Sequence, residues 1–112
     1  MIRNLRNDCA LAHDIVAAFD SKTRRTGLLR HTSFPEGSAM LIAPSNAVHT
    51  FFMRFPIDIL FATRDGRVVK ASPNVPARRI VGTLRGFAVI ELAAGELARS
   101  QTVAGDRIAV AE

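Results

Sequence analysis

The stretch ILFATRDGRVVKA, residues 59–71, carries the clearest local structural signal in this chain. Asp65-Gly66 lies between two apolar runs, and glycine readily adopts the positive φ angle that a tight hairpin turn requires. The stretch therefore predicts two antiparallel strands joined by a turn at residues 65–66.

Further strands are expected on both sides of this hairpin. Residues 38–44 (SAMLIAP) and 48–53 (VHTFFM) are rich in apolar and branched side chains, which is typical of strands. Residues 86–93 (GFAVIELA) are largely apolar on both faces, which predicts a central strand. A last strand is expected at residues 107–111.

The remaining segments are expected to be helical, extended or irregular. Residues 21–30 (SKTRRTGLLR) predict one short basic helix, and residues 94–101 predict a single helical turn. Residues 9–19 indicate a strand or an extended lead-in. Residues 72–86 contain two prolines and two glycines, so they are expected to form a long and partly exposed connection.

These elements together predict the fold class. Six or so strands, one helix near the N-terminus and no βαβ alternation favour a mainly antiparallel β-sandwich or small barrel. The chain has 112 residues, of which 48% are apolar and 22% charged. This length and composition predict a single globular domain over residues 1–112.

Cysteine content and hydropathy narrow the cellular setting. The one cysteine, Cys9, excludes an intramolecular disulfide and a thiolate metal site. The first residues lack the apolar stretch of a signal peptide, and no segment approaches the run of about 18 apolar residues typical of a membrane span. We therefore expect a cytoplasmic protein with no membrane contact, or a secreted one if a leader was removed.

The charge pattern argues against nucleic acid as a partner. The chain carries 15 Lys and Arg residues against 10 Asp and Glu residues, a net charge of +5. A basic protein favours acidic partners. The arginines, however, are scattered along the chain and form no dense basic stripe of the kind that binds nucleic acid.

Ionisable residues interrupt two of the expected strands. If residues 48–54 were extended, His49, Phe51 and Met53 would share one face and Arg54 would lie on the other. In the next strand Asp58 stands among apolar neighbours, so burial would penalise its charged form unless a cation or backbone N–H groups offset the loss of water. Arg54 is the obvious cation, because its planar guanidinium suits a carboxylate.

Glu91 raises the same question in the expected central strand. Two interpretations are open for these residues. In the structural one, Arg54, Asp58 and Glu91 form an internal ion-pair network or hold backbone at strand ends. In the functional one, they line a shallow pocket together with His49.

Other chemistry finds little support in the sequence. The three histidines show neither HxH nor HExxH spacing, no GxSxG motif is present, and no glycine-rich phosphate loop occurs. We therefore expect no metal site and no cofactor. Phenylalanines beside Arg54 could stack nucleic-acid bases, but phenylalanines on strands more often belong to the core.

The order and spacing of several motifs resemble domain-of-unknown-function family 192, a family of small bacterial and archaeal domains. The motifs are RRTGLL at 24–29, HTFFMRFPIDI at 49–59, RDGRV at 64–68, IELAAG at 90–95 and Gly105-Asp106. The first differs from the family pattern by one position. The resemblance covers about residues 15–110.

The resemblance implies a compact β-rich fold with little helix and no established activity. It also gives weight to five matching residues as a set, which are His49, Met53, Arg54, Asp58 and Glu91. One branch of the family has Trp, Lys and Asn within the aromatic motif. This chain has other residues there, so no role of those three carries over.

The leading hypothesis is non-enzymatic binding of a small polar ligand or a partner protein in a groove near His49, Arg54, Asp58 and Glu91. Phe51 and Met53 would form its apolar wall. One alternative is a hydrolase or lyase that uses Asp58 or Glu91 as general acid or base. The other is nucleic-acid binding through the scattered arginines. We expect a monomer or a weak dimer.

Overall fold

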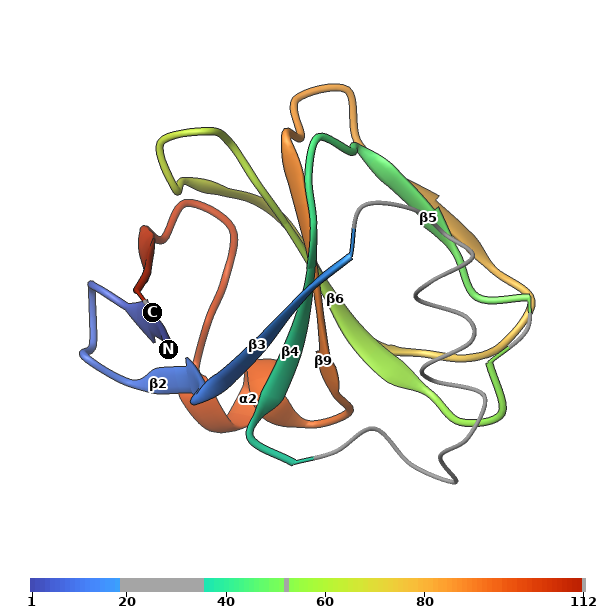
Figure 1. The fold of residues 1–112 in the computed structure, drawn as a ribbon, viewed down its shortest axis with the longest axis horizontal. Coiled ribbons are helices and arrows are strands. Elements are labelled where there is room, and N and C mark those ends of the chain that lie inside the picture. Colours follow the sequence, from blue (N-terminus) through green and yellow to red (C-terminus); the bar gives the residue numbers. More distant parts are fainter. Residues whose placement is uncertain (19–35, 52, 112) are drawn as a thin grey trace.

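The computed structural model describes residues 1–18, 36–51 and 53–111 (Figure 1). These residues contain one short helix and ten strands, and the strands form three open sheets. The strands are β1 (Ile2–Asn4), β2 (Ala10–Ala12), β3 (Asp14–Ala18), β4 (Ser38–Ile42), β5 (Ala47–His49), β6 (Ile57–Ala62), β7 (Val68–Val75), β8 (Ile80–Gly82), β9 (Ala88–Ala93) and β10 (Ile108–Val110), and the helix is α2 (Glu96–Ser100). This mostly β fold confirms the fold class expected from the sequence. The sheets do not close into a barrel among these residues.

A five-stranded sheet in the order β3-β4-β9-β6-β7 forms the centre of the molecule. β9 lies in its middle and is buried along its whole length, as the two apolar faces of residues 86–93 predict. β6, beside it, is also buried throughout. Four of the five strands pair antiparallel, whereas β3 pairs parallel with β4, which the sequence did not indicate.

The hairpin predicted at residues 65–66 joins β6 to β7. Gly66 has a φ angle of 90°, and its N–H donates to the carbonyl oxygen of Thr63 at 3.0 Å. Since this φ angle strains any residue with a Cβ atom, glycine is what allows the turn at this point.

The central sheet is covered on both faces. One face, which we call the helix face, carries Leu60, Ile90 and Leu92 and packs against α2 and the small sheet β10-β1-β2. The opposite face, which we call the ribbon face, carries Phe61 and Val89. It packs against the two-stranded β5–β8 ribbon. In Figure 1 these two small sheets lie on opposite sides of the central strands.

The strand expected at residues 48–53 is shorter than predicted. β5 ends at His49, because the Thr50 carbonyl oxygen accepts hydrogen bonds from the N–H groups of Met53 and Arg78, both at 3.1 Å. The Thr50 hydroxyl donates to the carbonyl oxygen of Pro76 at 2.7 Å. These bonds turn the chain, so the alternation of faces does not continue beyond His49.

The segments at residues 72–86 and 21–30 were also given an expected structure. Residues 72–86 are more regular than predicted, because they contain the end of β7 and all of β8. The helix expected at residues 21–30 lies outside the described residues. Within the described ranges, no helix has the length and apolar character needed to cross a membrane.

Candidate functional site

Asp58 is held by backbone groups rather than by a cation. It lies on β6, is fully buried and faces α2, since its strand partner Leu92 belongs to the helix face. One carboxylate oxygen accepts hydrogen bonds from the N–H groups of Gly95 and Leu97, at 3.1 and 2.8 Å. The other accepts the N–H of Asn74 at 2.8 Å. Asp58 thus caps α2 and fixes β7 at once.

The start of α2 requires an acceptor from outside the helix. Gly95 is the N-cap residue of α2 and has no side chain with which to satisfy the first N–H groups of the helix. An acceptor from elsewhere in the chain must therefore supply that contact, and a carboxylate suits the positive end of a helix. Asn74 adopts a left-handed φ angle of 50°, which points its N–H at the same carboxylate.

Arg54 does not pair with Asp58. Its side chain is exposed, it lies in the irregular segment between β5 and β6, and it forms no ion pair with any described residue. The expected Arg54–Asp58 pair is therefore wrong. The backbone alternative that the sequence left open is the one observed.

Glu91 lies on the opposite side of the sheet from Asp58. On β9 it stands between Met40 of β4 and Ile59 of β6, on the ribbon face, and its side chain is 1% exposed. Because the two carboxylates belong to opposite faces, they cannot line one groove or act on one substrate together.

His49 borders a pocket lined by residues of β4, β5 and β8. The pocket has a volume of about 240 Å³ and is lined by Ile42, Ser45, Ala47, Val48, His49, Phe51 and Ile80. The His49 and Phe51 rings lie 5.5 Å apart between centroids, tilted by 40°. Phe51 is 49% exposed and Ile80 is 73% exposed, so both offer apolar surface to solvent. We call this the His49 pocket.

The six predicted site residues therefore divide into three groups. His49 and Phe51 come together in the His49 pocket. Met53 is half-buried against the ribbon-face core and Arg54 is exposed nearby in the chain. Asp58 and Glu91 are buried on the two faces of the central sheet.

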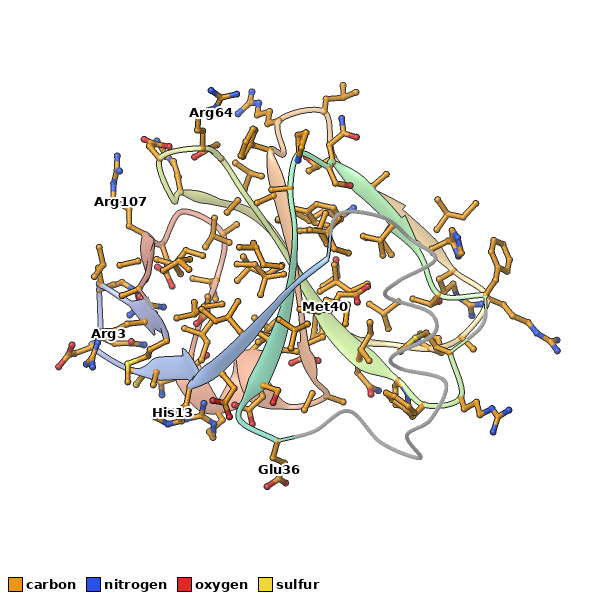
Figure 2. All side chains as sticks on the ribbon, viewed as in Figure 1. Arg3, His13, Glu36, Met40, Arg64 and Arg107 are labelled. Carbon is orange, nitrogen blue, oxygen red and sulfur yellow. The ribbon has the colours of Figure 1, made fainter. Side chains whose placement is uncertain are left out.

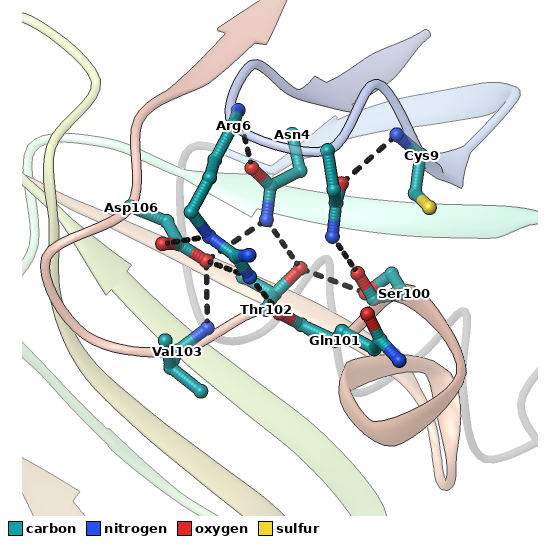
Figure 3. Close-up of polar contacts among 9 residues, drawn as sticks. Asn4, Arg6, Cys9, Ser100, Gln101, Thr102, Val103 and Asp106 are labelled. Atoms are coloured by element: carbon teal, nitrogen blue, oxygen red, sulfur yellow. Dashed lines mark hydrogen bonds and ion pairs between the residues drawn. The ribbon is translucent and has the colours of Figure 1, made fainter.

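A polar network that the sequence analysis missed joins the two ends of the chain (Figure 3). The buried Asn4 amide donates to Thr102 Oγ1 at 3.1 Å and to Asp106 Oδ2 at 3.0 Å. Arg6 Nε donates to Asp106 Oδ1 at 2.7 Å, and the Val103 N–H donates to Asp106 Oδ2 at 3.0 Å. The hydrogen bond from Arg6 lowers the pKa of Asp106 to about 2, with help from Val103 and Asn4.

No group of three or more histidine, cysteine or acidic side chains within residues 1–18, 36–51 and 53–111 could hold a metal ion. Among the lining residues of the His49 pocket that the structure describes, His49 is the one titratable side chain. The geometry therefore offers a mostly apolar recess with a single hydrogen-bonding imidazole.

The comparisons with known proteins agree on the fold. A crystal structure of a candidate transcription regulator from Sinorhizobium meliloti 1021 superposes with a TM-score of 0.73 at 24% identity, covering 85% of this chain and 79% of that one. A protein of unknown function from Novosphingobium aromaticivorans DSM 12444 gives a TM-score of 0.72 at 22% identity, covering 86% and 74%. A search of curated proteins found no match.

The sequence comparison extends over almost the whole chain. Residues 3–110 match the family of domain of unknown function 192, described as an uncharacterized ACR. The match includes the strands that carry Asp58 and Glu91 and the segment that carries His49. The resemblance of the motifs and the likeness of the folds point the same way, and the chain belongs to the DUF192 family.

Proposed function

We propose that this domain is a binding module that takes a small ligand in the His49 pocket. The ligand would place an apolar group against Phe51, Ile80 and Ile42 and a hydrogen-bonding group against His49. The observation that supports this most directly is the pocket itself, a concave apolar recess with one convergent imidazole.

Size and charge narrow the ligand class. A volume of about 240 Å³ is smaller than the roughly 300–1,000 Å³ typical of drug-sized ligands, which favours a compact molecule. No acidic side chain is found among the described residues that line the pocket, and two exposed arginines are close to them in the sequence, Arg54 three positions after Phe51 and Arg79 just before Ile80. A neutral or anionic ligand is therefore favoured over a cationic one.

The burial of the acidic residues favours binding over catalysis. General acid-base chemistry requires a titratable group within hydrogen-bond reach of the reacting atoms. The Asp58 carboxylate, on the helix face, accepts hydrogen bonds from three backbone N–H groups. Glu91, on the ribbon face, is 1% exposed. Neither borders the His49 pocket.

Regulation through nucleic acid has less support. At 24% identity, the likeness to the Sinorhizobium protein concerns the fold alone. Several arginines of this chain stand in ion pairs with acidic side chains, which reduces the positive charge that they could offer to phosphate groups. These pairs are Arg3–Asp8, Arg6–Asp106, Arg99–Glu96 and Arg107–Asp65.

A fragment titration followed by ¹H–¹⁵N chemical shifts tests this proposal. The probes are neutral and anionic compounds of about ten non-hydrogen atoms, a size that suits so small a pocket. We expect saturable shifts at Ala47, Val48, His49 and Ile80. Ile80→Ser should weaken binding by roughly tenfold, because it removes one exposed apolar wall.

Leu84→Ser is the matched control. Leu84 is fully exposed and lies just beyond β8, but it does not line the pocket. The Leu84→Ser variant should therefore bind the same fragments with the affinity of the parent protein. Shifts that spread over unrelated surfaces, or equal losses in both variants, would contradict a specific site beside His49.

A further inference from the structure

A second pocket lies on the helix face, where the β6–β7 hairpin meets β10. It has a volume of about 350 Å³, larger than the His49 pocket and separate from it in all its lining residues. Ala62, Ile90 and Ile108 are buried in its floor, whereas Arg64 and Asp65 are exposed at its rim. We call it the hairpin pocket.

Arg64 is held in place at this rim without using its hydrogen-bond donors. Its guanidinium carbon lies 4.4 Å from the centre of the Phe87 ring, and Phe87 also lines the pocket. Stacking of this kind orients the planar group while leaving its N–H groups free. Arg64 forms neither a hydrogen bond nor an ion pair with any residue of the described ranges.

The other charged groups at this rim are already engaged. Asp65 accepts a hydrogen bond from the Thr63 hydroxyl and pairs with Arg107 at 3.4 Å. The Thr63 hydrogen bond is the largest cause that lowers the pKa of Asp65, so this carboxylate stays charged. Figure 2 shows Arg64 and Arg107 on the same side of the molecule. With Asp65 offset by Arg107, the unused positive charge belongs to Arg64.

We propose that the hairpin pocket binds a small monocarboxylic acid with a branched aliphatic or aromatic tail. The tail packs against Ile90 and Ile108, and the carboxylate forms a two-pronged pair with Arg64. A single pre-oriented guanidinium selects a planar anion with one charge. The volume accommodates a small acid and falls at the lower end of the range for ligand pockets.

This inference does not depend on the proposed role of the His49 pocket. The two pockets share no lining residue, and they lie against opposite faces of the central sheet. Binding at either one leaves the other free, so the two proposals fail or succeed separately.

The test uses two acid probes, isovalerate and phenylacetate, and the neutral amide of each. We expect each acid to give saturable ¹H–¹⁵N shifts at Ala62, Gly66, Ile90 and Ile108. The amides, which have the same shape without the charge, should bind roughly tenfold more weakly or not at all. Shifts at Ala47, Val48 and Ile80 would instead report the His49 pocket.

Two variants and a control locate the site. Arg64→Met keeps most of the side-chain length but removes the charge, and it should weaken binding of the acids by roughly tenfold or more. Val110→Phe adds bulk at a lining residue that is 48% exposed, so it should reduce binding without disturbing the buried core. Arg67→Met removes an equal charge three positions from Arg64, at an exposed residue outside the lining.

Binding in the Arg67→Met variant should equal that of the parent protein. Equal losses in Arg64→Met and Arg67→Met would show general attraction to a basic surface and overturn the proposal. So would equal affinity for acids and amides, or shifts confined to the His49 pocket. An absence of saturable shifts at acid concentrations up to about 10 mM would also overturn the proposal, since even millimolar binding would be visible at these concentrations.

Discussion

Asp58 is a buried carboxylate whose three hydrogen-bond donors all come from the backbone. Asp58 itself lies on β6, whereas the donors come from β7 and from the start of α2. Sequence reasoning identified Asp58 as the residue most in need of a partner and chose Arg54, a nearby cation. Backbone N–H groups carry no residue-specific signature, so the correct partners could not be read from side-chain types.

Asp58→Asn should destabilise the protein by about 3 kcal/mol, since an amide can replace only one of the two accepting oxygens and leaves buried N–H groups facing an NH₂ group. The free energy of unfolding in urea at neutral pH measures this. Arg54→Gln is the control, because Arg54 is exposed and unpaired among the described residues. A comparable loss in Arg54→Gln would restore the ion-pair interpretation.

At the scale of elements, segments with a local cause were predicted well. The β6–β7 hairpin follows from Asp65-Gly66, and the burial of β9 follows from its two apolar faces. β5 was predicted too long, because Thr50 ends it through hydrogen bonds to residues 76–79, which are distant in sequence. β1 has only three residues, too few for a periodic pattern, and was missed.

Gly66→Ala tests the hairpin turn. Gly66 has a φ angle of 90°, and a Cβ atom there would lie 2.4 Å from the carbonyl oxygen of Ile108. Backbone strain and this collision together should reduce the free energy of unfolding by about 2–4 kcal/mol.

Gly105→Ala separates the two causes. Gly105 has a φ angle of 97°, but a Cβ atom there would have open space around it. Gly105→Ala should therefore reduce the free energy of unfolding by about 1–2 kcal/mol, the cost of the backbone conformation alone. Equal losses in the two variants, measured by urea unfolding, would show that contact with β10 adds nothing.

At the scale of the whole molecule, the two ends of the chain complete one sheet. β1 lies between β10 and β2, and Asn4 reaches Thr102 and Asp106 across about a hundred residues of sequence. Such pairing leaves no local trace, because each partner looks like an ordinary polar or apolar residue in its own segment. The same limit applied to the His49 pocket, whose walls Ile42 and Ile80 come from β4 and β8.

The network around Asp106 should make stability depend on pH. Its folded pKa of about 2 lies below the usual 3.8, so its contribution is fully present above about pH 4 and is lost as the pH falls towards 2. Asp106→Asn should flatten this part of the curve of unfolding free energy against pH. Arg6→Gln should flatten it in part, because Arg6 is the main cause of the lowered pKa. If the slope of unfolding free energy against pH between about pH 2 and 4 were the same in both variants as in the parent protein, Asp106 would not be the group responsible.

The pairing of β1 with β10 has a mechanical consequence. The two strands run antiparallel, Ile2 lies opposite Val110, and the Ala111 N–H donates to the Met1 carbonyl oxygen at 2.9 Å. Because Met1 and Ala111 lie at the same end of this strand pair, a force that pulls the two ends of the chain apart would load these hydrogen bonds one after another rather than all together. We therefore expect the outer sheet to peel away at low force, while the central sheet, held from within by α2 and Asp58, resists longer.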